Sequence, residues 1–331
     1  MRRPRRRFAE IGGDRRSGIR RGSAPSRAAP TRAAGSPTLR QHRFLAIPSI
    51  GAEAGAGGID AEHVADLAYA ALIGELETWP KPGLVSPVDS GSHDDMDADT
   101  LRRSAESLRP YFAEFVVAGA HGAAMADLRT IGIRAEAAMM RATHGINAHR
   151  GAIFSLGLIC AAAGATGGQP VSAEAYAVTV GARWGADISR VPASPSSHGG
   201  RAARRYGVGG ASAEAAAGFP TIREVGLPAL RLGRIRAPDD PEAARVECFF
   251  ALLAVVDDTN LLHRGGANGL AAARAEAAAF IAGGGIGTPG WRDRAATVHR
   301  SFVTARLSPG GCADLLAATL LLDALGTGQY P

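Results

Sequence analysis

Apolar residues recur at helical spacing along most of the chain beyond residue 60. In residues 60–78, for example, Val64, Leu67 and Leu72 fall on one helical face, and Asp60 stands where an N-cap is expected. Strand patterns are nearly absent, with few β-branched runs and no Asn-Gly hairpins between apolar segments. The sequence therefore predicts an all-α body of about nine or ten helices. We expect helices at about 60–78, 98–120, 129–143, 149–164, 172–187, 240–257, 268–282, 290–305 and 311–325.

Polar connections rich in Gly, Pro, Ser and His separate these predicted helices and hold most of the unusual side chains. Residues 44–59 contain Gly at four positions and read as a linker. We therefore expect a disordered Arg-rich tail and linker over residues 1–59 and a single all-helical domain over 60–331. The polar connections are expected at residues 79–97, 144–148, 189–212, 258–267, 283–289 and 307–311.

The charge of the chain is divided unevenly between this tail and the body. Residues 1–43 carry thirteen arginines and two acids, a local charge of +11, whereas the whole chain carries +6 and the remainder therefore −5. A nucleic-acid-binding face is a basic part of the fold, so an acidic body argues against nucleic acid as its partner. The tail buries too little apolar surface to fold, and it fits a disordered extension, a misassigned start codon or a transit peptide.

The cysteines and the apolar runs argue against a disulfide-stabilised protein, a zinc protein and a membrane protein. Cys160, Cys248 and Cys312 lie far apart in apolar helical text without a CxxC pair, which supports neither a disulfide framework nor a zinc site. We expect that no apolar run reaches the length of a membrane span, since the longest, near residues 152–163, is short, and we expect no secretory leader. We therefore expect a soluble, cytoplasmic protein without a membrane partner.

The chain contains one lysine, Lys81, and thirty-six arginines. Solvated positions accept either cation, so the retained lysine favours a role that needs a compact ammonium rather than a planar guanidinium. Pro80 and Pro82 hold it in a rigid, non-helical loop. We expect Lys81 to contact a phosphate or a carboxylate; chance retention at a solvated turn is the alternative.

An acidic cluster follows the lysine loop at residues 89–97 and includes His93. Mg²⁺ is commonly bound through one or two carboxylates plus substrate phosphates. Asp95 and Asp97 are therefore candidate magnesium ligands. The alternative is that Asp97 or Asp99 caps the next helix and the other acids are solvated.

A second polar motif stands at the start of another predicted helix. Glu136 lies on the preceding helix, and Asn147, His149 and Arg150 follow within one short loop. Free backbone N–H groups and the helix dipole favour an anion at such a start. A lone histidine is more often structural, but these three side chains together favour a functional site.

A third motif, DDTNLLHRGG, ends an apolar segment with acid, amide and guanidinium groups before two glycines. Asp258 and Asn260 begin it, and Arg264 precedes Gly265 and Gly266. An arginine beside a Gly-Gly backbone can bind phosphate oxygens with two parallel hydrogen bonds. We therefore expect this segment to contact phosphates.

A fourth motif, SPGGCADLLA, opens the last predicted helix. Gly310 and Gly311 allow close backbone approach, and Asp314 lies one turn inside, near whatever occupies the helix start. The glycines match neither the P-loop nor the dinucleotide-binding pattern, and the sequence has no serine nucleophile elbow or HExxH zinc motif. The combined acids, bases and glycine-rich helix starts suit a magnesium-nucleotide site.

The segment from Ser197 to Pro220 contains Ser197-His198-Gly199, Glu214 and Gly218-Phe219-Pro220. Without further context it reads as a flexible surface loop.

Five ordered segments give the chain a family resemblance: PKPGLV, GSHDDMDA, RAEAAMMRATHGINAHRGAIFSLGL, DDTNLLHRGG and SPGGCADLLA. In this order, over about residues 60–326, they closely resemble the triphosphoribosyl-dephospho-CoA synthase family. WPKPGLVS and the Leu-Leu-His of the fourth segment are similar to the branch that serves malonate decarboxylase; the citrate lyase branch is the alternative. The family usually has Thr where this chain has Ala148 and Arg where it has Ser212. The second departure puts a contact to a substrate phosphate or to Glu214 in question.

The resemblance implies an all-helical enzyme that joins ATP to 3′-dephospho-CoA and releases adenine. The product is the precursor of an acyl-carrier prosthetic group. The implied partners downstream are a phosphoribosyl-dephospho-CoA transferase and the acyl carrier protein itself.

The implied reaction is glycosyl transfer, because the 2′-hydroxyl of dephospho-CoA attacks C1 of the ATP ribose while adenine departs. Such a reaction requires a base for the nucleophile and an acid for the leaving group. We expect His149 or Glu136 to be the base and Asp314 to contact the ribose or protonate adenine. The magnesium ligands are then Asp95, Asp97 and Asp258, and the substrate-binding residues are Lys81, His93, Asn147, Arg150, His198, Glu214, Asn260, Arg264, Gly265, Gly266, Ser308, Gly310 and Gly311.

Two other functional classes fit the same residues. A magnesium-dependent hydrolase of ADP-ribosyl bonds would release ADP-ribose rather than adenine. An Arg-tailed nucleic-acid accessory protein would lose its salt-sensitive affinity when residues 1–43 are removed, whereas an enzyme would keep its activity.

Overall fold

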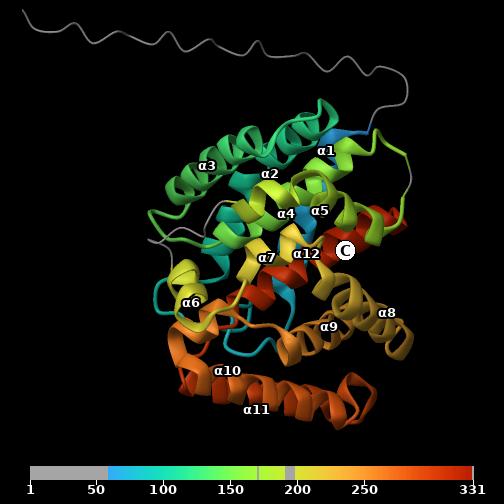
Figure 1. The fold of residues 1–331 in the computed structure, drawn as a ribbon. Coiled ribbons are helices and arrows are strands. Elements are labelled where there is room, and N and C mark those ends of the chain that lie inside the picture. Colours follow the sequence, from blue (N-terminus) through green and yellow to red (C-terminus); the bar gives the residue numbers. More distant parts are fainter. Residues whose placement is uncertain (1–58, 170, 191–197, 330–331) are drawn as a thin grey trace, which may run out of the picture. The chain divides into compact units, whose positions relative to one another are not determined.

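The computed structural model describes residues 59–169, 171–190 and 198–329, and every regular element in these ranges is a helix (Figure 1). The all-α prediction is therefore confirmed for this part of the chain. Apart from Ile59, the predicted tail and linker lie outside the described residues, as does Ser197.

The described ranges contain twelve α-helices, more than the nine or ten expected, and two short helices of other types. The α-helices are α1 (Ala61–Glu77), α2 (Ala98–Ala120), α3 (Met125–Ala142), α4 (Arg150–Ala165), α5 (Ala173–Arg190), α6 (His198–Tyr206), α7 (Gly210–Ala216), α8 (Leu227–Arg236), α9 (Pro241–Val255), α10 (Thr259–Ala282), α11 (Trp291–Thr304) and α12 (Gly310–Thr327). A π-helix, η1 (Ile222–Gly226), precedes α8, and a 3-10 helix, η2 (Gly285–Gly287), follows α10.

The helices that the sequence pattern missed, α6, α7 and α8, lie between residues 198 and 236. Nine residues in α6 and seven in α7 are too few for a helical repeat to become visible, and Gly207 with a positive φ separates the two. In α8, Leu232 and Ile235 are exposed, which blurs the apolar stripe. The expected surface loop is therefore partly helical.

The predicted connection at residues 258–267 is mostly helical as well. Asp258 caps α10 by accepting hydrogen bonds from the backbone N–H groups of Asn260 at 2.8 Å and Leu261 at 3.0 Å. The helix then breaks at Gly266, whose φ of 63° and ψ of −164° are accessible to glycine alone. The motif DDTNLLHRGG thus forms a capped helix start followed by a kink.

The core is organised around α12, which packs against α1, α4, α5 and α9 (Figure 1). Both α12 and α4 are apolar on nearly every face, as expected for helices surrounded by other helices. Because α4 and α12 both begin at the same cavity, their burial fixes the positions of the polar residues in their first turns.

Helices α2 and α4 approach each other at glycines. A β-carbon on Gly119 would lie 1.9 Å from the carbonyl oxygen of Ala161, and one on Gly164 would lie 1.9 Å from that of Val116. No side chain fits at either point, so the two helix backbones are in direct contact.

Helix α12 is also the one described helix that is long and apolar enough to cross a membrane by length and composition. The expectation that no apolar run reaches this length is therefore wrong for Gly310–Thr327. Within the protein, 61% of that segment is buried, and a core helix passes the same test. The finding is weak support for a membrane span.

Candidate active site

A cavity of about 190 Å³ opens where α4, α10 and α12 begin, beside the end of α1 and the loop that follows it. It brings together residues from four motifs that are far apart in the sequence. Nine of the predicted site residues line it: His93, Asn147, His149, Arg150, Asn260, Arg264, Ser308, Gly310 and Asp314.

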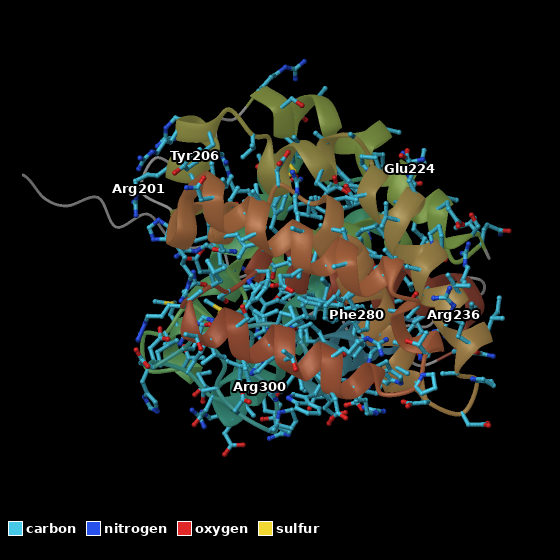
Figure 2. The ribbon with its side chains drawn as sticks, turned by 90° about the horizontal axis from the view of Figure 1, so that it is seen from below. Arg201, Tyr206, Glu224, Arg236, Phe280 and Arg300 are labelled. Carbon is cyan, nitrogen blue, oxygen red and sulfur yellow. The ribbon has the colours of Figure 1, made fainter. Side chains whose placement is uncertain are left out.

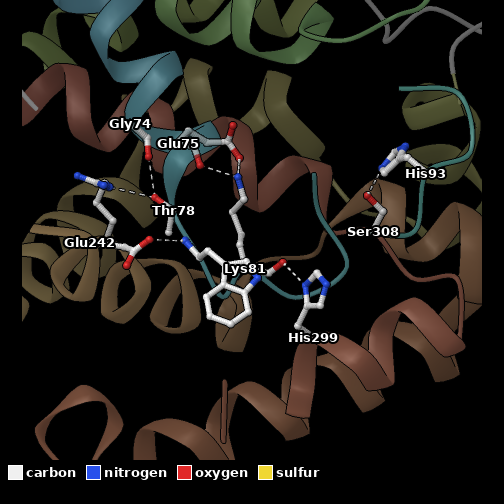
Figure 3. Close-up of polar contacts among 10 residues, drawn as sticks. Gly74, Glu75, Thr78, Lys81, His93, Glu242, His299 and Ser308 are labelled. Atoms are coloured by element: carbon white, nitrogen blue, oxygen red, sulfur yellow. Dashed lines mark hydrogen bonds and ion pairs between the residues drawn. The ribbon is translucent and has the colours of Figure 1, made fainter. Parts of the chain in front are cut away.

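Lys81 lies behind this cavity instead of in its wall. Its side chain is completely buried, and Nζ donates to the main-chain oxygen of Glu75 at 2.5 Å and forms an ion pair with the Glu75 carboxylate (Figure 3). Burial lowers the pKa of Lys81, and the Glu75 carboxylate opposes that shift. The retained lysine therefore contacts a carboxylate, one of the two partners expected, while Glu75 lines the cavity.

The loop around Lys81 is held by a second buried group. The ring of His299, on α11, lies with Nδ1 3.0 Å from the main-chain oxygen of Lys81 (Figure 3). Its Nε2 lies 3.1 Å from an Asp89 carboxylate oxygen. This contact joins the loop to α11 and fixes the direction from which Lys81 reaches Glu75.

Asp314 lies one turn inside α12 and is half-buried. Burial raises the pKa of its carboxyl well above the usual range, and the charges of Glu75 and Asp258 raise it further, against a hydrogen bond from the Ala152 amide. A β-carbon on Gly151 would lie 1.9 Å from an Asp314 oxygen, so this close approach requires glycine. The environment favours a protonated carboxyl that can donate a proton.

His149 is the N-cap residue of α4 and is buried. Its Nδ1 lies 2.7 Å from the Ser104 hydroxyl, whereas its buried Nε2 has no partner. Among the described residues Ser104 Oγ has no other hydrogen-bond partner, so we assign the hydroxyl as the donor to Nδ1 and place the ring proton on Nε2. Burial, followed by the charge of Lys81, lowers the pKa of His149 to about 4. His149 is therefore neutral, and its buried Nε2–H has no hydrogen-bond partner among the described residues.

Arg150 reaches the cavity from the start of α4. Its guanidinium forms an ion pair with Glu136, and its backbone N–H donates to Asn147 Oδ1 at 3.2 Å. Glu136 itself is not among the described lining residues. The ion pair indicates that Glu136 orients Arg150.

His93, Ser308 and Arg264 form another part of the cavity wall. His93 Nε2 lies 2.8 Å from the Ser308 hydroxyl (Figure 3), and Arg264 donates to the main-chain oxygens of Ser92 at 3.1 Å and Arg306 at 3.2 Å. Burial lowers the pKa of His93, and the nearby Arg264 guanidinium lowers it further. This wall offers a neutral imidazole and a fixed cation.

The glycine pair that begins α12, Gly310 and Gly311, allows α10 to approach it closely. A β-carbon on Gly310 would lie 2.7 Å from Asn260 Nδ2, and one on Gly311 would lie 3.0 Å from Asp258 Oδ2. Asp258 Oδ2 accepts from the Cys312 amide at 2.9 Å. Asp258 thus connects the starts of α10 and α12, and both of these helices contribute residues to the cavity.

The three predicted magnesium ligands are not among the described residues that line the cavity. Asp97 caps α2 through Thr100, with its Oδ1 2.8 Å from the backbone N, and both oxygens of Asp258 accept backbone N–H groups. Asp95 is exposed, 3.5 Å from His93 Nδ1. Within the described ranges no group of three or more His, Cys, Asp or Glu side chains is arranged to hold a metal ion. Asp95 alone keeps a carboxylate that is not used as a helix cap.

The remaining predicted residues lie elsewhere. Glu214 accepts from the Thr221 backbone N–H at 2.8 Å and side-chain hydroxyl at 2.9 Å, and Gly265 packs against Leu307. Gly266 lines a different cavity. His198 is the first residue of α6, and its side chain lies outside the described part of the structure.

Sequence reasoning missed two residues of the site. Glu75 is an acid on the buried side of an apolar helix, six positions before the single lysine, and this conjunction was the available clue. Ser104 is a buried serine in the middle of α2, and nothing in the sequence around it marks a function.

The sequence is similar to those of known proteins. The model of the family described as ATP:dephospho-CoA triphosphoribosyl transferase matches residues 61–330. A protein from Stutzerimonas stutzeri is 42% identical over 270 residues, 80% of this chain and 92% of its own length. One from Pseudomonas aeruginosa is 43% identical over 270 residues (80% and 91%), and one from Acinetobacter calcoaceticus is 38% identical over 259 (77% and 88%). All three are named probable 2-(5''-triphosphoribosyl)-3'-dephosphocoenzyme-A synthase. No solved structure matches the chain.

Proposed function

The chain belongs to the ATP:dephospho-CoA triphosphoribosyl transferase family, and from this premise we propose that it makes the prosthetic-group precursor for malonate decarboxylase. The reaction joins ATP to 3′-dephospho-CoA with release of adenine. The observation that carries the proposal is the cavity in which a proton-donating Asp314, a carboxylate and two arginines meet at helix starts.

The chemistry forms a C–O bond and breaks a C–N bond at C1 of the ATP ribose. The 2′-hydroxyl of dephospho-CoA loses a proton, and adenine gains one as it leaves. Asp314 supplies the proton to adenine, because its raised pKa keeps the carboxyl protonated. Glu75, which lines the same cavity, accepts the proton of the hydroxyl. Two carboxyl groups with separate roles resemble the arrangement in glycosidases.

His149 assists without changing its protonation state. Its pKa of about 4 makes it a weak base near neutrality, and its assigned Nε2–H is a donor. We place this donor against the substrate, where it holds the ribose or the base. Glu75 is thus the proposed general base, in place of His149 or Glu136, which were expected from the sequence.

The triphosphate is bound by the basic side of the cavity. Arg150 lies at the N-terminus of α4, where the dipole favours an anion, and Arg264 lines the same cavity from α10. Asp95 would hold Mg²⁺ together with the phosphates, and the ion would neutralise phosphate charge. His93 and Ser308 fix the neighbouring loop between these charges.

The pathway is proposed from the motifs. WPKPGLVS and Leu-Leu-His favour malonate decarboxylase over citrate lyase as the recipient system. The product would pass to a phosphoribosyl-dephospho-CoA transferase and then to the acyl carrier protein. We also propose that the enzyme works in the cytoplasm, where both substrates are available.

The test is an assay of the purified protein with Mg²⁺, ATP and dephospho-CoA. Adenine should appear when both substrates are present and should not appear with either substrate alone. Release of ADP-ribose from ADP-ribosyl substrates would instead identify a hydrolase. Deleting the gene should abolish prosthetic-group attachment to the malonate decarboxylase carrier protein; loss confined to citrate lyase would reassign the pathway.

A further inference from the structure

A second cavity, of about 540 Å³, lies between α6 and α10. Figure 2 labels two of its lining residues, Arg201 and Tyr206, both on α6. We call it the basic cavity and define it by Arg201, Arg205, Tyr206, Leu262, His263 and Gly266.

We infer that the basic cavity binds the diphosphate and the adjoining pantetheine arm of 3′-dephospho-CoA. The inference rests on the proposed function, since it assigns a place to one of the two substrates. The diphosphate requires cations, and the arm requires a partly apolar wall.

The charge of the basic cavity fits the diphosphate. Arg201 and Arg205 stand one helical turn apart on α6, both exposed, and none of the described lining residues is acidic. The Arg205 guanidinium lies 5.3 Å from the centre of the Tyr206 ring, which restricts its orientation. Two arginines on one helical face can bind adjacent phosphates through paired hydrogen bonds.

The composition of the chain makes this charge informative. Outside residues 1–43 the chain carries a net charge of −5, so a basic cavity is not the average character of this surface. Ala202 and Leu262, which are both buried, form an apolar part of the cavity wall beside the arginines. This mixture suits a diphosphate with a long, partly apolar substituent better than it suits a bare triphosphate.

Residues near the kink in α10 line both cavities. Arg264 lines the first cavity and Gly266, two residues later, lines the basic cavity, a separation of at most about 7 Å along the chain. The reacting 2′-hydroxyl and the 5′-diphosphate of dephospho-CoA sit on the same ribose, so their sites must be adjacent. A β-carbon at Gly266 would approach the Tyr206 hydroxyl to 3.3 Å, so glycine also keeps this wall open.

The allocation of the two substrates follows from size and charge. The first cavity combines Arg150, Arg264 and two helix starts in a smaller space, which suits the more highly charged triphosphate. The basic cavity is larger, has two arginines and carries apolar wall, which suits the less charged and longer molecule.

The experiment uses the full chain with Arg201 and Arg205 both replaced by alanine, and Arg204→Ala as the control. Arg204 lies on the same helix, is exposed and carries the same charge, but it is not among the lining residues. Adenine release is measured while one substrate is varied and the other is saturating. We expect the KM for dephospho-CoA to rise at least about tenfold in the double variant, with the KM for ATP within about twofold of wild type.

An unchanged KM for dephospho-CoA, or a rise confined to the KM for ATP, overturns the inference. Calorimetric titration without ATP gives a second readout that does not depend on turnover. The double variant should bind dephospho-CoA at least about tenfold more weakly and bind adenosine, which lacks the diphosphate, as wild type does. Equal weakening for both ligands contradicts the inference. If the double variant melts early, the single variants Arg201→Gln and Arg205→Gln replace it.

These outcomes are separate from those of the proposed function. A wild-type protein that releases no adenine from ATP and dephospho-CoA refutes the proposed function, and the calorimetric comparison still tests the basic cavity. A wild-type protein that releases adenine, with a double variant of unchanged KM, refutes the basic cavity alone.

Discussion

The two cavities hold their charges in opposite ways. In the first, Glu75 and His149 are buried and Asp314 is half-buried, and burial shifts the pKa of both His149 and Asp314. In the basic cavity, Arg201 and Arg205 are exposed. Burying ionisable groups is costly, and shifted protonation states are useful where protons move. Exposed arginines attract and hold an anion at little cost. The contrast assigns chemistry to the first cavity and substrate capture to the second.

If that contrast is right, changes in the first cavity should lower kcat, and changes in the basic cavity should raise KM. The expected effects differ widely in size.

The largest effect is expected for Asp314→Asn, which keeps the shape of the side chain but removes its transferable proton. We expect kcat for adenine release to fall roughly 10³-fold, with both KM values within about threefold of wild type. Activity of the wild type should also decrease as pH rises through the raised pKa of Asp314, because the proton is then lost.

Asp323→Asn is the matched control for this change. Asp323 is a buried acid on the same helix, paired with Arg234 away from the first cavity. It should keep kcat within about threefold of wild type if the variant folds. A near-normal kcat for Asp314→Asn would remove the proton donor from the proposal.

A smaller but substantial loss is expected for Lys81→Arg. Lys81 fills a closed space, and the longer, planar guanidinium cannot reproduce its contact with Glu75. Adenine release should fall on the order of 10²-fold as Glu75 is displaced in the cavity. Lys81→Met keeps an unbranched side chain but removes the charge, so the buried Glu75 carboxylate loses its ion pair. The free energy of unfolding, measured by chemical denaturation, should fall by roughly 3–5 kcal/mol. Near-normal adenine release by Lys81→Arg would show that the lysine is incidental.

The third prediction concerns stability and pH. The unfolded chain binds a proton at His149 below about pH 6.5, whereas the folded protein does so only below about pH 4. The free energy of unfolding should therefore decrease as pH falls through this window, by roughly 3 kcal/mol from this residue. Urea titrations at several pH values measure the slope, and His149→Gln should flatten it. An equal slope in that variant would mean that His149 titrates normally.

The smallest effect is expected for Ser104→Ala. Losing the hydroxyl releases Nδ1 and allows the other ring tautomer, so kcat should fall by about threefold to tenfold with little change in KM. The ¹⁵N shifts of His149 should report Nε2–H in wild type and a mixture in the variant. Ser107→Ala, one turn away and bonded to the main-chain oxygen of Ser104, should change neither. A wild-type ring protonated at Nδ1 would refute the assigned tautomer.

The fold class and most of the first cavity could be predicted, because they depend on local signals. Helical spacing located α1 and α2, and the polar motifs at His149, Arg264 and Asp314 marked helix starts that meet in space. Lys81 was recognised as exceptional from composition alone. A sequence does not give the direction of a side chain, however, so the expected contact of Lys81 could not be decided between a phosphate and the carboxylate of Glu75.

The rest depends on tertiary contacts. Asp97 and Asp258 have the residue type of a metal ligand. In the structure, however, their carboxylate oxygens accept hydrogen bonds from backbone N–H groups. The basic cavity was hidden because α6 is short and lies in text that resembles a loop. Ser104 gained a role only because α2 passes beside His149.

The glycine contacts between α2 and α4 have a consequence at a distance. Ser104 lies on α2 and His149 caps α4. The distance between these two side chains therefore depends on how closely the two helix backbones approach each other at Gly119 and Gly164. A single methyl group at Gly119 would push the two helices apart. This would lengthen the hydrogen bond between Ser104 and His149, although Ser104 lies fifteen residues away from Gly119 along α2. Inactivating substitutions in a random library should therefore cluster at these remote glycines as well as around the substrates.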